Sequence, residues 1–311
     1  RGKTALKPIQ GPIGKDVPGD SSVLKPVDNS WKGLALTSDV NPYLMEANPY
    51  HGTMSAVEEV CRNLAAVGAR IDSLADCLCF GNPRRPDIMG QFKASCEALK
   101  DAATVVDVPY VSGNVSLYNE TAEGAIPPTP VLMGIGLVED IRKCVTSDMK
   151  KEGSIWIVGE TKEEMGASIY YRNLELESAN VPTTNFEEFM PRMEQLVQAI
   201  ENNEVVACHD ISTGGLAITV IEMCMSGIGA NIELTSDLRA DIEMFSESNG
   251  RWIVQVAPGC DDKFANRFDY AKKIGDCGNE IVFTKDGEIL SRLDIEKTRK
   301  TWTAPIWDRL A

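Results

Sequence analysis

The chain has 311 residues, of which 43 % are hydrophobic and 25 % are charged, a composition typical of globular proteins and not of disordered or low-complexity chains. Its length suits two domains of ordinary size. The 31 lysine and arginine residues face 46 aspartate and glutamate residues, so the net charge is −15, and nucleic acid and anionic membrane surfaces are poor partners. Nucleotide phosphates remain possible ligands, because Mg²⁺ can bridge a carboxylate and a phosphate.

Neither a run of roughly 20 apolar residues nor a signal peptide is visible, so we expect a cytoplasmic protein without a membrane span. Nine cysteines, an odd number, are scattered through apolar segments. Cys77 and Cys79 have no further Cys or His at metal-site spacing, which favours reduced thiols over a zinc site. The chain begins at Arg1 without a methionine, and we therefore expect it to be part of a longer protein.

In the N-terminal part, hydrophobic periodicity and turn residues predict an alternation of strands and helices. The expected strands are residues 22–24, 33–38, 71–80, 105–111 and 131–138. The expected helices are residues 53–67, 87–104 and 140–147. Residues 112–121 are expected to form a polar loop.

The C-terminal part begins after a short charged linker at residues 150–153. The expected strands are residues 154–158, 205–208, 253–256 and 280–283. A long amphipathic helix is expected around residues 186–200, a second helix at 216–225, and another between the last two strands. Strands alternating with helices in both parts predict an α/β or α+β fold. We place the two domains at residues 1–148 and 149–311.

Small and acidic residues stand at the ends of four predicted strands. Asp39, Asp76 and Asp210 supply carboxylates, and Gly113 with Asn114 follows the third strand. Hard oxygen ligands suit Mg²⁺, and glycine lets backbone N–H groups approach a phosphate. Each residue also has a plain structural interpretation, as a turn residue, a helix cap or a solvated side chain. No Walker loop, G-x-G-x-x-G motif or serine elbow is present.

Glu59 and Asn63 are four residues apart on a predicted helix, so their oxygens share one face and could reach one cation. His209, one of two histidines, is more often a packed residue in such a position than a catalyst. The residues alone thus predict a two-domain protein that binds an anion through a metal ion.

Two segments carry a closer resemblance: DCLCFGNP at residues 76–83 and SGNVSLYNET at residues 112–121. They closely resemble phosphoribosylformylglycinamidine synthase, and similar segments extend over most of the chain (residues 39–42, 49–52, 62–69, 128–130, 209–216 and 246–248). Cys79 departs from the family pattern, which usually has Asn there. The chain resembles the C-terminal half of the small-form catalytic subunit.

The resemblance implies an aminoimidazole ribonucleotide synthetase-like half. Its N-terminal α/β domain forms half of a barrel, which the other half of the enzyme completes, and its C-terminal domain is an α/β sandwich. It further implies an ATP-dependent ligase of purine biosynthesis that converts formylglycinamide ribonucleotide and glutamine-derived ammonia to formylglycinamidine ribonucleotide through an iminophosphate. The implied cofactors are Mg²⁺ and ATP or ADP.

The resemblance also assigns roles to single residues. Asp76 and Gly113 match ATP-contacting positions, Asn114 matches a Mg²⁺ ligand, and Ser116 matches a substrate contact. A second set matches a non-catalytic nucleotide and metal site of larger relatives: Asp39, Glu59, Asn63 and Asp210. No catalytic residue is expected in this half, so His209 is not the general base.

The implied partners are the N-terminal half of the same enzyme, a glutaminase subunit and a small accessory subunit. We expect the isolated chain to lack turnover and to self-associate as a homodimer through its exposed sheet. An alternative is a structural half that carries only a static Mg²⁺-nucleotide. A third hypothesis, ranked lower, is another member of the superfamily, such as aminoimidazole ribonucleotide synthetase itself or a selenophosphate or thiamine-phosphate enzyme.

Overall fold

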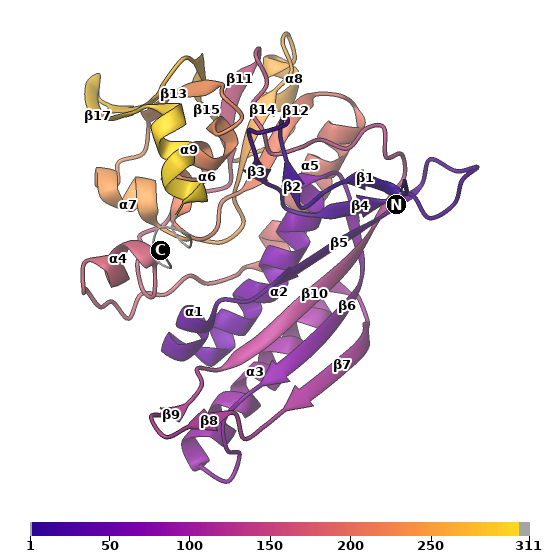
Figure 1. Cartoon of the computed structure of the whole chain (residues 1–311), viewed down its shortest axis with the longest axis vertical. Coiled ribbons are helices and arrows are strands. Elements are labelled where there is room, and N and C mark those ends of the chain that lie inside the picture. Colours follow the sequence, from indigo (N-terminus) through magenta and orange to yellow (C-terminus); the bar gives the residue numbers. More distant parts are fainter. Residues whose placement is uncertain (1, 305–311) are drawn as a thin grey trace.

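The computed structural model describes residues 2–304 and contains two main β-sheets, one in each half of the chain (Figure 1). The N-terminal sheet has the strand order β1-β4-β5-β10-β6-β7. In chain order its strands are β1 (Thr4–Leu6), β4 (Ser22–Leu24), β5 (Gly33–Asp39), β6 (Arg70–Cys79), β7 (Tyr110–Ser116) and β10 (Thr129–Val138). Two small hairpins accompany it, formed by β2 (Ile9–Gln10) with β3 (Val17–Pro18) and by β8 (Glu120–Thr121) with β9 (Gly124–Ala125).

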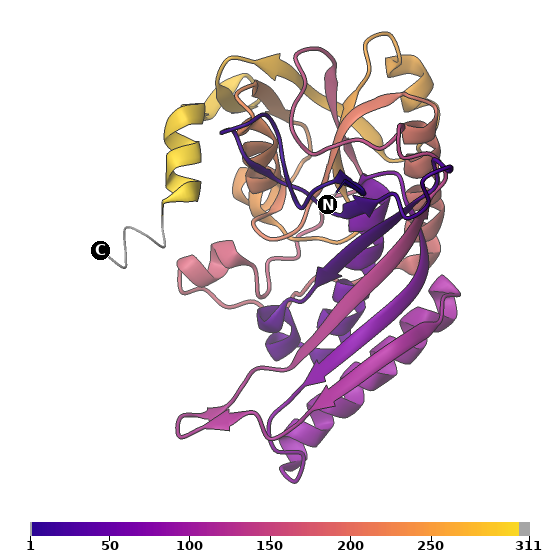
Figure 2. The same ribbon diagram turned by 45° about the vertical axis from the view of Figure 1, so that its right-hand side comes forward.

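Helices cover one face of this sheet. They are α1 (Pro42–Ala47), α2 (Pro49–Ala66) and α3 (Pro86–Val106). Alternation along β10 explains the arrangement, because Leu132 is fully buried while its neighbour Met133 is exposed. Leu74 and Leu78 on β6 join Leu132 in the core beneath α2 and α3. In Figure 1 the strands lie in front of these two helices, and Figure 2 shows α3 running behind β7.

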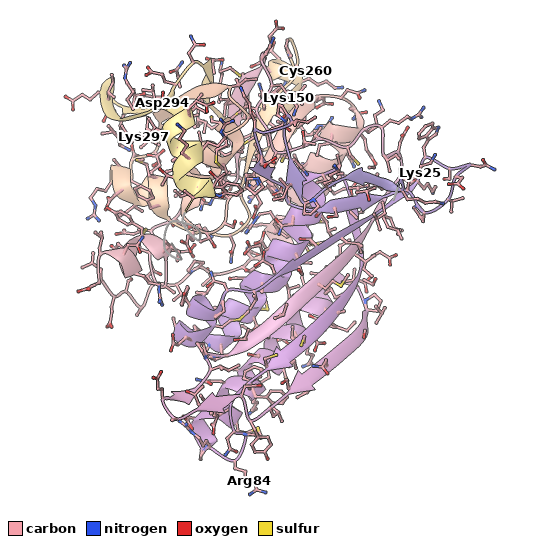
Figure 3. All side chains as sticks on the ribbon, viewed as in Figure 1. Lys25, Arg84, Lys150, Cys260, Asp294 and Lys297 are labelled. Carbon is pink, nitrogen blue, oxygen red and sulfur yellow. The ribbon has the colours of Figure 1, made fainter. Side chains whose placement is uncertain are left out.

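The other face of the N-terminal sheet is left uncovered by the described residues. Met133 and Leu137 on β10 are 37 % and 45 % exposed there. In Figure 3, Lys25 marks the segment after β4 and Arg84 the turn after β6, at opposite ends of this sheet. Apolar side chains on an open sheet face are unusual for a monomeric protein and indicate an interaction surface.

The C-terminal sheet has the order β12-β14-β11-β15-β13-β16-β17. In chain order its strands are β11 (Ser154–Val158), β12 (Val205–Asp210), β13 (Gly229–Leu234), β14 (Trp252–Val256), β15 (Ala271–Gly278), β16 (Ile281–Lys285) and β17 (Glu288–Leu293). Its helices are α4 (Ile169–Asn173), α5 (Phe186–Glu201), α6 (Gly215–Cys224), α7 (Ala240–Phe245), α8 (Asp261–Ala265) and α9 (Ile295–Thr303). Core side chains of α5 pack on one face and those of α6 on the other.

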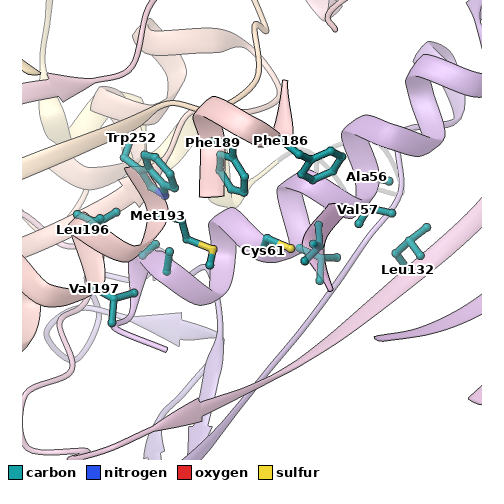
Figure 4. Close-up of a cluster of buried hydrophobic side chains, with 14 of the residues drawn as sticks. Ala56, Val57, Cys61, Leu132, Phe186, Phe189, Met193, Leu196, Val197 and Trp252 are labelled. Carbon is teal, nitrogen blue, oxygen red and sulfur yellow. The ribbon is translucent and has the colours of Figure 1, made fainter. Parts of the chain in front are cut away.

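A shared core joins the two halves (Figure 4). Trp252 at the start of β14 is fully buried, stacks on Phe189 of α5 and donates its indole N–H to the Arg62 carbonyl of α2 over 3.1 Å. At the edge of this contact Arg70 pairs with Glu194 and Glu201 of α5. Apolar burial across α2 and α5 therefore fixes how the two sheets face each other.

The predicted α/β fold is confirmed, but some local predictions are wrong or incomplete. Residues 112–116 are not loop: they belong to β7, which begins at Tyr110, because α3 continues to Val106. Residues 140–147 do not form a helix; the Asp140 carboxylate accepts the Arg142 N–H over 3.0 Å and closes a turn instead. Strands β13, β15 and β17 were not predicted. Within residues 2–304, no helix is both long and apolar enough to cross a bilayer.

Candidate functional site

An acidic cluster lies where the N-terminal sheet, α2 and the C-terminal sheet meet. Asp39 ends β5, Glu59 lies on α2, and Asp210 ends β12. Arg62 links them, with its Nε 3.1 Å from Asp210 Oδ2 and its Nη2 3.6 Å from Glu59 Oε2. The structure therefore brings together three of the four residues of the second predicted set.

The helix α2 positions the centre of this cluster. Asn48 caps its N-terminus by accepting the His51 N–H, and proline occupies the first helical position. Asn63, the fourth predicted residue, follows Glu59 by one turn and is 6 % exposed. Its carbonyl accepts the Ser21 hydroxyl over 2.9 Å, so this turn of α2 is also tied to the segment before β4.

The carboxyl groups crowd around one guanidinium. Arg62 is 1 % exposed and also pairs with Glu58, which is fully buried. Burial raises the pKa of Glu58 to about 7 against the opposing effect of Arg62. Burial and then Asp210 raise the pKa of Asp39 to about 6, and burial and Asp39 raise the pKa of Glu59 well above its ordinary value. The raised pKa values of these carboxyl groups show that the positive charge of Arg62 does not balance all of them.

Asp20 is a member of the cluster that sequence reasoning missed. Its Oδ1 lies 2.8 Å from His209 Nδ1 and accepts the Asp210 N–H over 3.0 Å. His209 Nε2 lies 3.3 Å from Glu222 Oε2. Burial disfavours the imidazolium, but Asp20 and Glu222 outweigh it and raise the pKa of His209. Asp20 precedes strand β4 instead of ending a strand, so it lacks the strand-end position that marks the other carboxylates in the sequence.

The donor set suits a hard divalent cation. Ligand atoms of Asp20, His209 and Asp210 lie within 4.8 Å of one another, and Asp20 Oδ2 is buried with no hydrogen-bond partner among residues 2–304. A buried orphan carboxylate oxygen costs free energy unless something binds it. Carboxylate oxygens are what Mg²⁺ prefers. Asp20 and Asp210, with Asp39 and Glu59 beside them, are the residues that would hold such an ion.

A cleft adjoins this cluster. Side chains of Glu59 and Arg62 line it from α2, and Ser212, Thr213 and Asn249 line it from the C-terminal half. Asn249 Nδ2 donates to Ser55 Oγ of α2 over 2.7 Å. The hydroxyl groups of Ser212 and Thr213, close to acidic metal-type ligands, offer hydrogen bonds to a phosphorylated ligand.

The first predicted set lies elsewhere, on neighbouring strands of the N-terminal sheet. Asn114 and Ser116 of β7 pair in register with Cys77 and Cys79 of β6. Asn114 Nδ2 lies 3.4 Å from Cys77 Sγ, and these side chains share the uncovered face. Asn114 and Ser116 are two residues apart on β7, so their side chains lie on the same face of the sheet and one ligand could contact both.

The Asp76 side chain lies on the opposite face of the sheet, the face that the helices cover, as does that of its register partner Leu132 on β10. Gly113 is the register partner of Asp76 on β7. A Cβ on Gly113 would come within 2.9 Å of Asp76 Oδ2, so glycine is needed for the carboxylate to lie over this strand. Burial raises the pKa of Asp76, with a hydrogen bond from the Asn114 backbone opposing. Because β7 is an edge strand of the sheet, a ligand that wraps around its free edge could contact both faces.

Two family models match the chain. Residues 18–138 match "AIR synthase related protein, N-terminal domain", and residues 151–280 match "AIR synthase related protein, C-terminal domain". The chain belongs to the AIR synthase related protein family. This confirms the resemblance that its motifs predicted. Neither match tests the predicted boundary between residues 148 and 149, which stays a prediction.

Among relatives in this family, the phosphoribosylformylglycinamidine synthase subunit PurL of Methanothrix thermoacetophila is 37 % identical over 322 residues, covering 98 % of this chain and 41 % of the relative. The chain thus spans about two fifths of the length of that relative. Among solved structures, Thermotoga maritima PurL complexed with FGAR has a TM-score of 0.76 at 16 % identity, covering 90 % of this chain and 48 % of that one. The same protein complexed with ADP has a TM-score of 0.72 at 17 % identity, covering 94 % and 47 %. These structural matches establish the fold.

Proposed function

We propose that this chain is the C-terminal half of the catalytic subunit of a phosphoribosylformylglycinamidine synthase. The observation that carries the proposal is the 37 % identity to a PurL subunit over 98 % of the chain, together with Asn114 and Ser116 standing in one row on an uncovered sheet face. In the proposed reaction, ATP, formylglycinamide ribonucleotide and ammonia give formylglycinamidine ribonucleotide, ADP and phosphate.

In this reaction the role of the chain is to bind and orient ATP and the ribonucleotide. ATP phosphorylates the amide oxygen, which turns a poor electrophile into an iminophosphate, and ammonia then displaces the phosphate. Phosphoryl transfer depends mainly on positioning and on neutralising charge. Ser116 is proposed to contact the ribonucleotide, Asn114 to hold a metal ion, and Asp76 and Gly113 to contact the nucleotide. Mg²⁺, when bound, would supply positive charge at the phosphates.

The remaining machinery is proposed to lie in partners, in the cytoplasm. The uncovered face of the N-terminal sheet and its two edge strands, β1 and β7, offer a surface for the N-terminal half of the enzyme. Ammonia is proposed to come from a separate glutaminase subunit, with a small accessory subunit in the assembly. The isolated chain should therefore lack synthase turnover and self-associate, which light scattering over a concentration series would test; a strict monomer at high concentration contradicts it.

The test of the catalytic role is assembly of this chain with the N-terminal half and assay of ATP-dependent product formation with ammonia. Asn114→Ala should lower the rate on the order of 10²-fold, as loss of a group that stabilises developing charge does. Thr104→Ala, on the exposed side of α3, is the matched control and should leave the rate unchanged. An unchanged rate for Asn114→Ala would remove the metal-holding role.

A second candidate function is a structural half with a static Mg²⁺-nucleotide in the acidic cluster. Asp20 Oδ2, which is buried beside Asp210 and has no hydrogen-bond partner in the described part of the chain, favours it. Calorimetry of ADP binding with Mg²⁺ should then show an affinity that Asp210→Asn abolishes. Mass spectrometry of gently released ligand should find ADP or ATP. Absence of both signals would contradict a nucleotide at this cluster.

A further inference from the structure

Two thiols stand side by side on the uncovered face of the N-terminal sheet. Cys77 and Cys79 are two residues apart on β6, so a regular strand points both side chains the same way. Their Sγ atoms are 3.8 Å apart, a proximity that the sequence does not indicate, because the lack of a further Cys or His at metal-site spacing favours reduced thiols over a zinc site there. Both side chains are partly exposed. A ligand approaching this face of the sheet (the face toward the viewer in Figure 1) therefore meets two sulfur atoms at once.

The spacing of the sulfur atoms matches a known coordination geometry. Two thiolates that each lie about 2.3 Å from one tetrahedral zinc ion are roughly 3.8 Å apart. The observed separation is 3.8 Å, so neither side chain has to move to share an ion. Soft thiolate ligands select thiophilic cations over Mg²⁺, which takes oxygen ligands.

The neighbouring strands leave room for further ligands. Asn114 Nδ2 already contacts Cys77 Sγ over 3.4 Å, and a turn of this amide would exchange its nitrogen for its oxygen. Ser116, opposite Cys79, is engaged with Asn119 over 3.3 Å. On the other side the register places Val131 opposite Cys77 and Thr129 opposite Cys79. Two protein thiolates with positions open toward solvent make an accessible site rather than a closed structural one.

We propose that Cys77 and Cys79 form a two-thiolate site for a thiophilic d¹⁰ cation of the Zn²⁺ type. Binding replaces two S–H bonds by two metal–sulfur bonds and releases two protons to solvent, so no oxidant or reductant takes part. The site is separate from the acidic cluster, whose oxygen ligands suit a hard cation. The Cys77–Cys79 site adjoins Asn114. An ion bound by the two thiolates would therefore interfere with any ligand that Asn114 binds, a consequence that rests on the proposed function.

The probe is Cd²⁺, which reports thiolate binding by charge-transfer absorbance. The chain, kept reduced with a phosphine, is titrated with Cd²⁺ while native mass spectrometry counts the ions retained. Wild type should retain one Cd²⁺ that Zn²⁺ displaces. The isosteric Cys77→Ser and Cys79→Ser variants should each bind at least about tenfold more weakly, as loss of a metal-site residue does. Cys260→Ser, which removes another partly exposed thiol, should bind as wild type does.

Two results would overturn the proposal: no thiolate–Cd²⁺ absorbance in wild type, or equal binding by wild type and Cys79→Ser. Either would mean that the two thiols are merely adjacent. Far-ultraviolet circular dichroism confirms that each variant is folded, and the two single variants test the site independently. Because the readout is binding and not turnover, the result does not depend on whether the chain supports synthase activity.

Discussion

Replacing Arg62 with methionine should reveal how strongly the acidic cluster depends on positive charge. Arg62 is 1 % exposed and pairs with Glu58 and Asp210. Methionine keeps much of the side-chain volume but removes the guanidinium. The neighbouring carboxyls then lose their cation in a buried setting, which costs about 3–5 kcal/mol when one partner of a buried ion pair is removed.

The loss should depend on pH. Burial raises the pKa of Glu58 to about 7 with Arg62 present, and without Arg62 its proton is held more tightly still. At about pH 5 the carboxyls can stay neutral in the folded chain, so Arg62→Met should cost less stability there than at about pH 7.5. Urea denaturation followed by tryptophan fluorescence at both pH values measures the difference.

Arg70→Met is the matched control, because Arg70 also pairs with two glutamates but is 34 % exposed in its side chain. Solvent screening should limit its cost to about 1 kcal/mol, with little change between the two pH values. Two results would contradict a cluster of buried carboxyls that depends on Arg62 for positive charge. One is an equal loss of unfolding free energy in Arg62→Met and Arg70→Met, and the other is a loss in Arg62→Met that does not change with pH.

Two further predictions concern the cluster and the sheet. Mg²⁺ affinity of the acidic cluster should rise from about pH 5 to pH 7.5, because Asp39 and Glu59 must lose protons before they can hold the ion, and the pKa of Asp39 is raised to about 6 and that of Glu59 well above its ordinary value; calorimetry across this range that finds a constant affinity would contradict the assignment. The same two groups should make the metal-free chain less stable as pH rises over this range, since the unfolded chain ionises first, and denaturation midpoints check this. Gly134→Ala should destabilise by about 1–3 kcal/mol, since its Cβ would lie 2.2 Å from Val60 Cγ1. Gly90→Ala, whose Cβ meets nothing within 4 Å on α3, should be neutral or stabilising, and equal thermal shifts for both variants would refute the packing argument.

Local patterns predicted most strands and helices because one face of each element is buried. The helix that carries Glu59 and Asn63 was predicted from its apolar spacing and is confirmed as α2, whereas a cation shared by their two side chains stays a prediction. The strand predicted at residues 105–111 lies at Tyr110–Ser116 in the structure, because α3 continues to Val106. Residues 111–115 of β7 are all exposed, so no alternation of buried and exposed residues marks the true bounds of this edge strand. Residues 140–147 have helix-like composition, but the Asp140 side chain competes for the backbone and forms a turn.

The site was harder to predict, since its residues meet only through the tertiary fold. Asp39 and Asp210 lie far apart in the chain, and only the family resemblance placed them together. The structure adds Asp20, Glu58 and Arg62, whose buried contacts leave no local sequence signature. It also separates Asp76 from Asn114 by placing them on opposite faces, which strand alternation explains once β7 is known to pair with β6.

The most direct test of the proposed function is product formation by this chain alone and after assembly with the missing N-terminal half, with ATP, Mg²⁺, ammonia and formylglycinamide ribonucleotide supplied. We predict no turnover by the chain alone and ATP-dependent turnover by the assembly. Ser116→Ala should raise the KM for the ribonucleotide in that assembly. Full turnover by the isolated chain, or none by a well-formed assembly of both halves, would contradict a composite active site to which this chain contributes the Asn114 and Ser116 row.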